Sequence, residues 1–172
     1  MEPEISPTLR KIRKVSVILR IMCKVLLILI AVVGVGAVVS VLFGVGGISY
    51  EDTPFRTAGL PLGSRLMVGA VTSLAFAALL KCVYHLRCLF GDYAKGEIFT
   101  RSAVGELRKF GIACLLWGVM KFIWGISLSL TAEPQRTFHG QADSFVIGAI
   151  LIVIAWFMDM AVDLREENEL AI

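Results

Sequence analysis

Charged residues are scarce in this sequence. Asp, Glu, Lys and Arg make up 18% of its 172 residues, whereas 57% are hydrophobic. A soluble domain usually carries about 25% charged residues, because its surface must be polar around a single core. Together with a mean hydropathy of +0.80, the shortage of charge excludes an ordinary soluble domain and favours a membrane protein.

Catalytic and cofactor-binding motifs are also missing. The sequence contains no G-x-S-x-G, no Walker-type phosphate loop and no H-E-x-x-H, and no single apolar stretch combines histidine with carboxylates. These motifs supply the nucleophile, the phosphate-binding amides or the zinc ligands of common enzymes. We therefore expect a non-enzymatic protein without a cofactor.

Histidine is rare, and only His85 lies near other metal-binding side chains. It sits between Cys82 and Cys88 in the stretch KCVYHLRC. On a helix at about 100° per residue these three side chains fan over about 120°, and a fourth ligand is missing, so no metal site is predicted. The stretch is instead typical of a helix leaving the membrane, with Lys81 and Arg87 reaching the headgroups.

Long apolar stretches are what the sequence has in abundance. A helix needs about 20 mostly apolar residues to cross the hydrocarbon core, because its backbone polar groups must all be paired within the segment. Four stretches meet this test, over about residues 22–43, 66–86, 110–130 and 144–162. No region alternates with a period of two over several strands, which excludes a membrane barrel. The sequence thus predicts an all-α, integral membrane four-helix bundle, with residues 1–172 forming one transmembrane domain.

Basic residues are placed unevenly around these spans. Most lie beside the first span or around the link between the second and third: Arg10, Lys11, Arg13, Lys14, Arg20, Lys24, Lys81, Arg87, Lys95, Arg101, Arg108 and Lys109. The other two links hold only Arg56, Arg65 and Arg136. By the positive-inside rule, the N and C termini and the middle link are cytoplasmic, and residues 48–65 and 131–143 face outward.

The sequence has four cysteines, and none falls in an outward-facing link. They are Cys23, Cys82, Cys88 and Cys114. These positions lie in lipid or on the reducing side of the membrane, where disulfides are rare. We therefore expect no disulfide.

The N-terminal segment has two interpretations. A cleaved signal peptide is disfavoured because the charged lead is long, the apolar run spans a bilayer and no A-x-A-like site follows. Ser6 and Pro7 fit an N-cap and a first helical position, so the basic stretch from Thr8 is expected to begin as a helix on the inner membrane surface. Its expected role is anchoring and orientation, and specific lipid recognition is the alternative.

Small residues recur at helical spacing in three of the four spans. The first carries Gly36, Ser40 and Gly44, the second Gly69, Ser73 and Ala77, and the third Gly111, Gly118 and Gly125. Membrane helices associate through close backbone approach, so such residues mark contact faces. They predict a compact bundle, and a homo-oligomer interface is the alternative use of the same faces.

One basic residue lies inside a span. Lys121 is in the middle of the third span, where a lone charge is costly and marks a functional candidate. Asp159 in the fourth span is the candidate partner, because the two intramembrane charges can meet if the Lys121 side chain leans inward. The alternative is structural: Lys121 reaches outward along the membrane, and Asp159 marks the inner interface with Asp163.

The link between the second and third spans predicts a cytoplasmic helical hairpin over about residues 87–109. Two apolar stripes define it: Leu86, Leu89, Phe90 and Tyr93 before the turn, and Val104, Leu107 and Phe110 after it. Gly96 offers a turn, and Thr100 can cap the new helix. Phe99 is expected to fold under the bundle.

The C-terminal tail is acidic, with apolar residues among its acids. The sequence DLREENELAI ends in Leu170 and Ile172 after Glu166, Glu167 and Glu169. Such a segment is expected to pack back onto the basic hairpin or onto another protein, and a frayed, solvated helix end is the alternative.

Two stretches are distinctive, GEIFTRSAVGELRKFG before the third span and LREENELAI at the C-terminus. On a four-span chain of this length they make the sequence resemble the bacterial membrane-protein family filed as domain of unknown function 2975. That family looks like short proteins with a G-x-x-F-T turn and an E-x-E-L-T-I-like end, and Ala171 stands where Thr is usual. Such proteins are often encoded beside a small helix-turn-helix regulator. The resemblance implies a protein of the bacterial inner membrane that senses something or sequesters that regulator.

The sequence therefore predicts a non-enzymatic protein, embedded in the lipid bilayer, that binds a cytoplasmic protein such as a helix-turn-helix transcription factor and does not bind nucleic acid directly. The expected partner-binding residues are Phe99, Arg101, Arg108, Lys109, Glu166, Glu167 and Glu169. A small transporter or channel component, suggested by Lys121 and Asp159, is the alternative, although the sequence shows no broken helices or inverted repeats. A structural subunit of a larger membrane complex is the third hypothesis.

Overall fold

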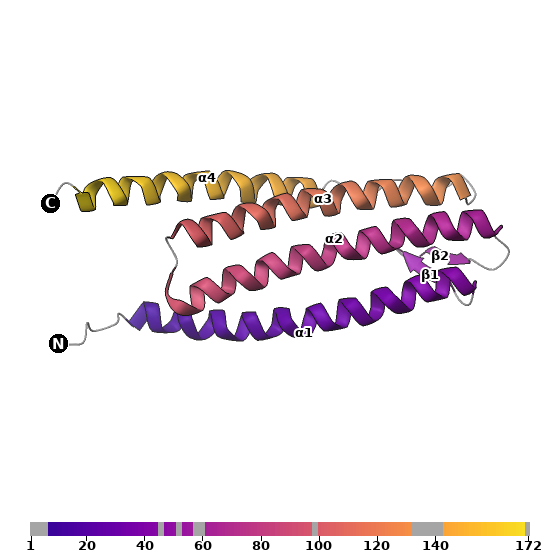
Figure 1. Ribbon diagram of the computed structural model, residues 1–172, viewed down its shortest axis with the longest axis horizontal. Coiled ribbons are helices and arrows are strands. Elements are labelled where there is room, and N and C mark those ends of the chain that lie inside the picture. The colour runs from indigo at the N-terminus through magenta and orange to yellow at the C-terminus, as the bar shows by residue number, and fades with distance from the viewer. Residues whose placement is uncertain are drawn as a thin grey trace.

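Four long helices and one short β-hairpin make up the computed structural model. It describes residues 7–44, 47–50, 53–56, 61–97, 100–131 and 143–170. The helices are α1 (Pro7–Phe43), α2 (Leu62–Lys95), α3 (Arg101–Thr131) and α4 (Asp143–Leu170), and the strands are β1 (Gly47–Tyr50) and β2 (Thr53–Arg56) (Figure 1).

All four helices are long and apolar enough to cross a membrane, which confirms the predicted all-α class with four spans. Each helix extends beyond its predicted apolar stretch. The N-terminal basic stretch and the first span form one continuous helix of 37 residues. The charged segments before and after the spans are therefore rigid extensions of the same helices.

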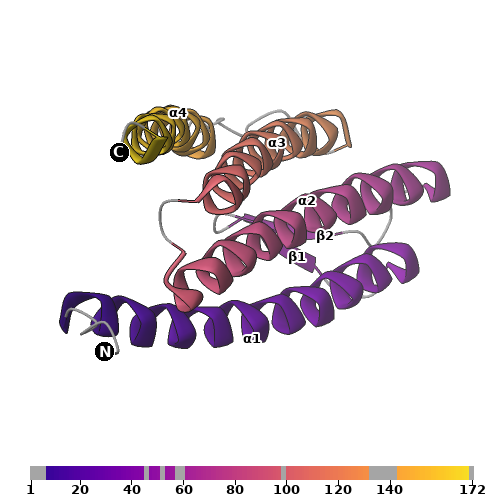
Figure 2. The same cartoon turned by 60° about the vertical axis from the view of Figure 1, so that its left-hand side comes forward.

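The helices are arranged in the order of the chain. α1 packs against α2, α2 against α3, and α3 against α4, and no other two helices of the described chain are in contact. Figure 2 shows α3 and α2 between α4 and α1. The predicted compact bundle is thus an open row with α1 and α4 at its edges. Lipid tails can cover the apolar edges, so closure is not required as it would be in water.

The closest backbone approach joins α3 and α4. A Cβ atom on Gly111 would lie 2.9 Å from Cγ1 of Ile152 and 3.2 Å from the carbonyl oxygen of Gly148. A Cβ atom on Gly118 would lie 3.2 Å from the ring of Phe145. The predicted contact face is confirmed for Gly111 and Gly118, because both lie directly against α4, and a Cβ atom on Gly111 would meet its backbone.

The prediction for α1 was wrong by two residues. A Cβ atom on Gly36 would meet nothing within 4 Å, whereas one on Gly34 would lie 2.9 Å from the ring of Phe76 in α2. Gly44 does not belong to a contact ladder in the helix, because it ends α1 with φ of 65°. A four-residue spacing therefore identified the correct helix but the wrong side of it.

The prediction for α2 holds at one of its three positions. Gly69 is buried, and a Cβ atom there would lie 3.3 Å from Leu42 of α1. Ser73 and Ala77 are exposed and line an apolar groove between α1 and α2. The Ser73 hydroxyl donates to the carbonyl oxygen of Gly69 within the same helix, at 2.8 Å.

The β-hairpin lies in the link that is predicted to face outward, and the sequence analysis missed it. Its strands pair antiparallel, with Gly47 opposite Arg56 and Tyr50 opposite Thr53. Strands of four residues place only two side chains on each face, so their alternation is too short to stand out from a loop.

Candidate functional site

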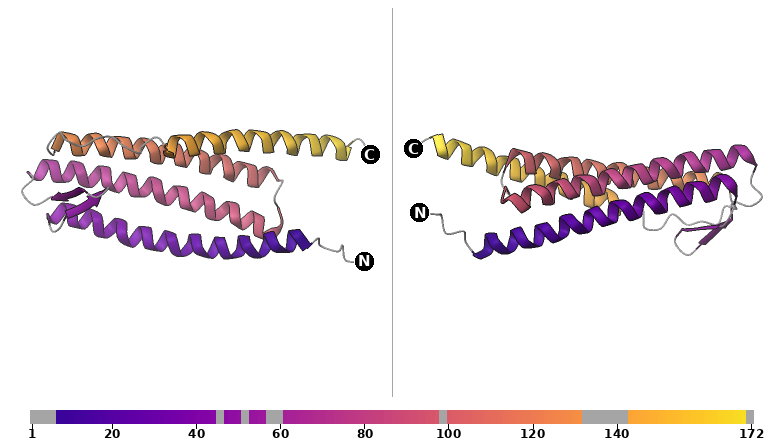
Figure 3. Two further views of the ribbon diagram at one scale, coloured as in Figure 1. Left: turned by 180° about the vertical axis from the view of Figure 1, so that it is seen from behind. Right: turned by 60° about the horizontal axis from the view of Figure 1, so that its bottom comes forward.

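One end of the molecule gathers the start of α1, the α2–α3 link and the end of α4 (Figure 3). We call it the charged end and define it as residues 7–24, 85–97, 100–109 and 159–170. It contains those predicted partner-binding residues that the structure describes: Arg101, Arg108, Lys109, Glu166 and Glu167. The opposite end carries the β-hairpin, the end of α1, the start of α2 and the end of α3.

The turn between α2 and α3 is built as the sequence predicts. Gly96 has φ of 90°, which favours glycine, and its N–H donates to the carbonyl oxygen of Tyr93 at 3.1 Å. The Thr100 hydroxyl then accepts from the N–H of Ala103 at 3.3 Å and caps α3. Both ends of the turn are therefore fixed by hydrogen bonds.

A small apolar core anchors the charged end. Leu89, Val104 and Leu107, from the two predicted stripes, are buried and form one cluster with Ala155 and Val162 of α4. Ala103 belongs to the same cluster, and Tyr93 packs against it. Burial also raises the pKa of the Tyr93 hydroxyl. Three helices therefore hold this end in a defined geometry.

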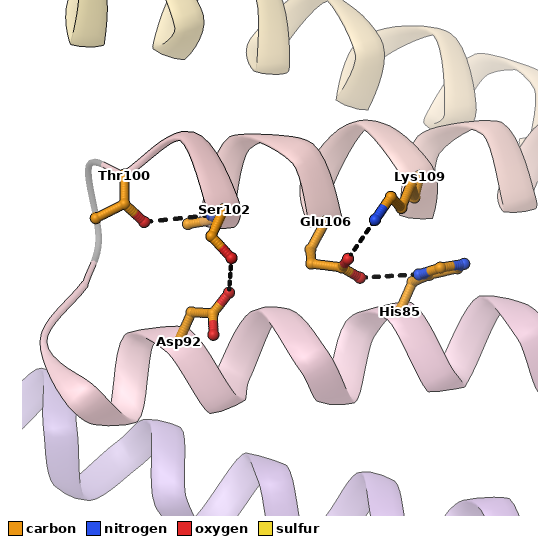
Figure 4. A network of polar contacts seen from close by, with 7 residues as sticks. His85, Asp92, Thr100, Ser102, Glu106 and Lys109 are labelled. Carbon is orange, nitrogen blue, oxygen red and sulfur yellow. Dashed lines mark hydrogen bonds and ion pairs between the residues drawn. The ribbon is translucent and has the colours of Figure 1, made fainter.

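A polar network joins α2 to α3 (Figure 4). Glu106 lies 2.9 Å from Nδ1 of His85 and accepts from Nζ of Lys109 at 2.7 Å. The hydroxyl of Ser102 donates to Asp92 at 3.0 Å. The side chains of His85 and Glu106 are only 13% and 16% exposed, so this contact is mostly shielded from water.

Two opposing effects act on Glu106. Partial burial raises the pKa of Glu106, but the hydrogen bonds from Lys109 and His85 together lower it by more. The pKa of Glu106 therefore lies below its ordinary value. The hydrogen bond between Lys109 and Glu106 also raises the pKa of Lys109. Glu106 is therefore held as a carboxylate that ties its own helix to α2.

The Cys82, His85 and Cys88 group does not converge on one point. His85 faces Glu106, whereas the Sγ atom of Cys82 lies 3.3 Å from the Sγ atom of Cys114 in α3. Within the described residues, no group of three or more His, Cys, Asp or Glu side chains could hold a metal ion.

A second charged link joins α3 to α4. Nε and Nη2 of Arg101 donate to the two carboxylate oxygens of Glu166 at 3.1 and 2.7 Å, and Nη2 also donates to Asp163 at 3.0 Å. We call this contact the Arg101 link. The hydrogen bond raises the pKa of Arg101 and lowers that of Glu166. The acidic end of α4 is thereby attached to the basic hairpin.

The other predicted partner-binding residues have different surroundings. Lys109 forms an ion pair with Glu106. Arg108 and Glu167 are exposed, and neither forms an ion pair within the described part of the chain. Phe99 and the side chain of Glu169 lie outside the described residues, so the expected folding of Phe99 under the bundle stays a prediction.

Sequence reasoning did not place Glu106 or Asp163 in a contact between helices. Both are acidic residues near basic ones, but their contacts depend on how α2, α3 and α4 are aligned lengthwise. Asp163 and Glu166 are three residues apart on one helix and so share a face, which was the available signal.

Lys121 and Asp159 are far apart along the helix axes. Gly118 packs against Phe145, so Lys121, three residues further along α3, lies at the level of the first residues of α4. Asp159 is 16 residues after Asp143, the first residue of α4, which is about 24 Å at 1.5 Å per residue. Lys121 and Asp159 are therefore too far apart to form the candidate intramembrane pair. The charge of Asp159 instead acts on Arg101.

These features define the class of this chain, which is a multi-pass α-helical membrane protein. The sequence model of one family, described as "Protein of unknown function (DUF2975)", matches residues 23–172. The chain belongs to this family, as the two distinctive stretches suggested. No curated protein and no solved structure matches the chain.

Proposed function

We propose that this protein is a non-enzymatic component of the bacterial cytoplasmic membrane, that its charged end faces the cytoplasm, and that this end binds a soluble protein. The orientation is supported by the excess of basic residues at the charged end. The location in bacteria is supported by the family resemblance.

The Arg101 link is the observation that carries the binding proposal. It places basic and acidic side chains from α3 and α4 next to each other at the surface. The side chains of Arg101, Asp163 and Glu166 are 64%, 55% and 51% exposed. Exposed ion pairs contribute little to stability, so charges of a partner can replace them at little cost.

The underlying scaffold makes this surface suitable for recognition. The buried cluster around Leu107 and the shielded contact between His85 and Glu106 hold the hairpin rigid. A rigid surface that keeps an exposed Arg108 and Glu167 available loses little freedom when a partner binds. The partner would carry both acidic and basic side chains.

The nature of the partner rests on the family resemblance. Because similar proteins are often encoded beside a small helix-turn-helix regulator, we propose that regulator as the soluble partner. Binding at the membrane would withhold it from DNA.

The transporter alternative loses its main support. It relied on Lys121 and Asp159 acting together inside the membrane, and the two lie about 24 Å apart along the helix axes. A flux in proteoliposomes that Lys121→Met abolishes would revive it.

A crosslinking pull-down from native membranes tests the proposal. The intact chain is compared with a chain truncated after Leu164, which lacks Glu166 and Glu167 but keeps the apolar span of α4. We expect a DNA-binding protein to be captured by the intact chain and lost with the truncation. Capture of membrane subunits alone by both chains would instead identify a structural or transport component.

Point variants refine the same pull-down. Arg101→Glu reverses the charge in the Arg101 link, and Arg108→Ala removes an exposed arginine from the same helix without touching the link. If the partner contacts the joined α3–α4 surface, Arg101→Glu weakens capture more than Arg108→Ala does. Capture by Arg101→Glu equal to that by the wild-type chain would place the binding surface elsewhere.

A further inference from the structure

An apolar groove of about 340 Å³ opens between α1 and α2. The two helices lie side by side and run in opposite directions (Figure 1). The walls of the groove extend from Ile30 to Val39 in α1 and from Ser73 to Leu80 in α2. They carry one hydroxyl, that of Ser73, which donates to the carbonyl oxygen of Gly69 within α2. The groove has the volume of a small-molecule site, about 300–1,000 Å³, and its walls suit a hydrocarbon chain.

Two close contacts fix the alignment of α1 and α2 at this groove. A Cβ atom on Gly34 would lie 2.9 Å from the ring of Phe76, and one on Gly69 would lie 3.3 Å from Leu42. Leu42 is eight residues after Gly34 in α1, and Gly69 is seven residues before Phe76 in α2. The two antiparallel helices therefore stay in step along the groove.

The same alignment holds at the charged end, fourteen residues earlier in α1 and fifteen residues later in α2. There, the guanidinium of Arg20 lies 3.7 Å from where a Cβ atom on Gly91 would be. Lys24, four residues after Arg20, is therefore level with Arg87, four residues before Gly91. The charge of Arg87 also reaches Cys23, the neighbour of Lys24 in α1.

One side of each helix leads from the groove to these cations. In α1, steps of three and four residues connect Gly34, Ala31, Leu27, Lys24 and Arg20. In α2, the same steps connect Ala77, Leu80, Tyr84, Arg87 and Gly91. Residues at such steps share one side of a helix. The groove and the cations are therefore parts of one continuous surface, with the cations toward the charged end.

Arg20, Lys24 and Arg87 have no acidic partner. None of them forms an ion pair within the part of the chain that the structure describes. α1 contains no Asp or Glu over its 37 residues, and the single acidic residue of α2, Asp92, accepts a hydrogen bond from Ser102 of α3. Arg20 and Lys24 are exposed, and Arg87 is half-buried. Their charges are therefore available to an anionic group from outside the chain.

The spacing along the helices fits one acyl chain. From Lys24 it is six residues, about 9 Å, to Ile30 at the near end of the groove, and fifteen residues, about 22 Å, to Val39 at the far end. One leaflet supplies about half of a hydrocarbon core of about 30 Å. A chain of about 15 Å that starts at the level of Lys24 therefore ends inside the groove.

We propose that this surface binds a phospholipid with a net negative headgroup. Its phosphate contacts Arg20, Lys24 and Arg87, and one of its acyl chains lies in the groove. Tyr84, which is 50% exposed, stands between the two parts, as aromatic residues do at the membrane interface. The cations select an anionic lipid, because a zwitterionic headgroup carries an amine that offsets their attraction. The site depends neither on the proposed soluble partner nor on which side of the membrane the charged end faces.

Native mass spectrometry of the full-length protein tests this site. The protein is reconstituted with equal amounts of phosphatidylglycerol and phosphatidylcholine that have the same acyl chains, and is then released in a mild detergent. We expect one phosphatidylglycerol to stay bound, several-fold more often than phosphatidylcholine. Equal retention of the two lipids would overturn the proposal, because the groove would then hold ordinary bilayer lipid. A lipid-free dimer would also overturn it, because a second copy would then cover the groove.

A pair of double variants tests the headgroup contact. Lys24→Gln with Arg87→Gln removes one cation from each helix of the site. Lys11→Gln with Lys14→Gln removes the same charge from exposed positions at the start of α1. We expect retention of phosphatidylglycerol to fall several-fold in the first double variant and to stay at the wild-type level in the second. Equal loss in both would overturn the site, because the overall charge of this end would then explain the binding.

A pair of single variants tests the acyl-chain contact. Ala77→Phe fills the groove, whereas Ala149→Phe adds the same ring at an exposed position of α4. We expect only Ala77→Phe to lose phosphatidylglycerol. Retention at the wild-type level in Ala77→Phe would overturn the proposal, because the lipid would then be held by its headgroup alone.

Thermal melting of the wild-type chain in detergent gives a readout that needs no substitution. Added phosphatidylglycerol is expected to raise the melting temperature more than phosphatidylcholine does, because a ligand that binds only the folded state stabilises it. Soluble glycerol 3-phosphate is expected to have no effect, since it lacks the acyl chain. An equal rise with glycerol 3-phosphate would overturn the lipid site in favour of a free phosphate site.

Discussion

α3 and α4 are held together in two different ways along their length. In the apolar region, Gly111 and Gly148 bring the two backbones into contact. At the charged end, the same helices are joined by exposed side chains through the Arg101 link. The first contact depends on the absence of side chains and is insensitive to salt, whereas the second depends on charges that water and partners can reach.

This difference separates a structural region from an exchangeable one. In the apolar region, no other group can take the place of the glycine contact, because nothing fits between two backbones that touch. The exposed ion pairs of the Arg101 link can be replaced by other charges without unfolding the helices. A binding partner is therefore expected to act on the charged end and leave the glycine contact unchanged.

The largest effect is expected for Gly111→Ala. Its Cβ atom would lie 3.2 Å and 3.3 Å from backbone atoms of Gly148 and Ile152, which cannot move aside. We expect a loss toward the upper end of about 1–3 kcal/mol in the free energy of unfolding, measured by thermal denaturation in detergent. Gly105→Ala in the same helix is the control, because a Cβ atom there meets nothing within 4 Å. Equal loss in both variants would contradict the close contact.

An intermediate effect is expected for Glu106→Ala. The variant removes the acceptor from His85, which is mostly shielded from water, and we expect a loss of about 1–2 kcal/mol in the same assay. Glu167→Ala, which removes an exposed carboxylate without an ion pair in the described residues, should leave stability unchanged. A loss no larger than that of the control would show that the α2–α3 network does not contribute to the free energy of unfolding.

The smallest and most local effect is expected for Arg101→Ala. The melting temperature should hardly change, because the link is exposed, but the amide hydrogens of residues 163–170 should exchange faster as the end of α4 loses its attachment. Arg108→Ala should leave this exchange as it is in the wild type. Unchanged exchange in Arg101→Ala would mean that the core around Val162 holds the end of α4 alone.

Local features of this chain could be predicted from the sequence. The turn at Gly96, the cap at Thr100 and the stripe through Val104 and Leu107 each follow from rules that operate within one or two helical turns. The presence of four helices long and apolar enough to cross a membrane was also predictable, because the bilayer sets the minimum length of an apolar span.

Contacts between distant segments could not be predicted in the same way. Arg101 and Glu166 are separated by 65 residues, and their contact depends on the lengthwise alignment of α3 and α4. The same alignment separates Lys121 from Asp159, whose pairing the sequence had left open. When one apolar helix slides along another, apolar residues still meet apolar residues, so the apolar pattern does not set the lengthwise alignment of α3 and α4. That alignment depends on the detailed packing at Gly111 and Gly118.

Side-specific labelling of two positions tests most directly whether the charged end faces the cytoplasm. A membrane-impermeant maleimide is applied to intact cells and to inverted membrane vesicles that contain Arg108→Cys or Thr137→Cys, with the wild-type chain as background. We predict that Arg108→Cys is labelled only in inverted vesicles and Thr137→Cys only in intact cells. Labelling of Arg108→Cys in intact cells would place the charged end outside and contradict the proposed cytoplasmic partner.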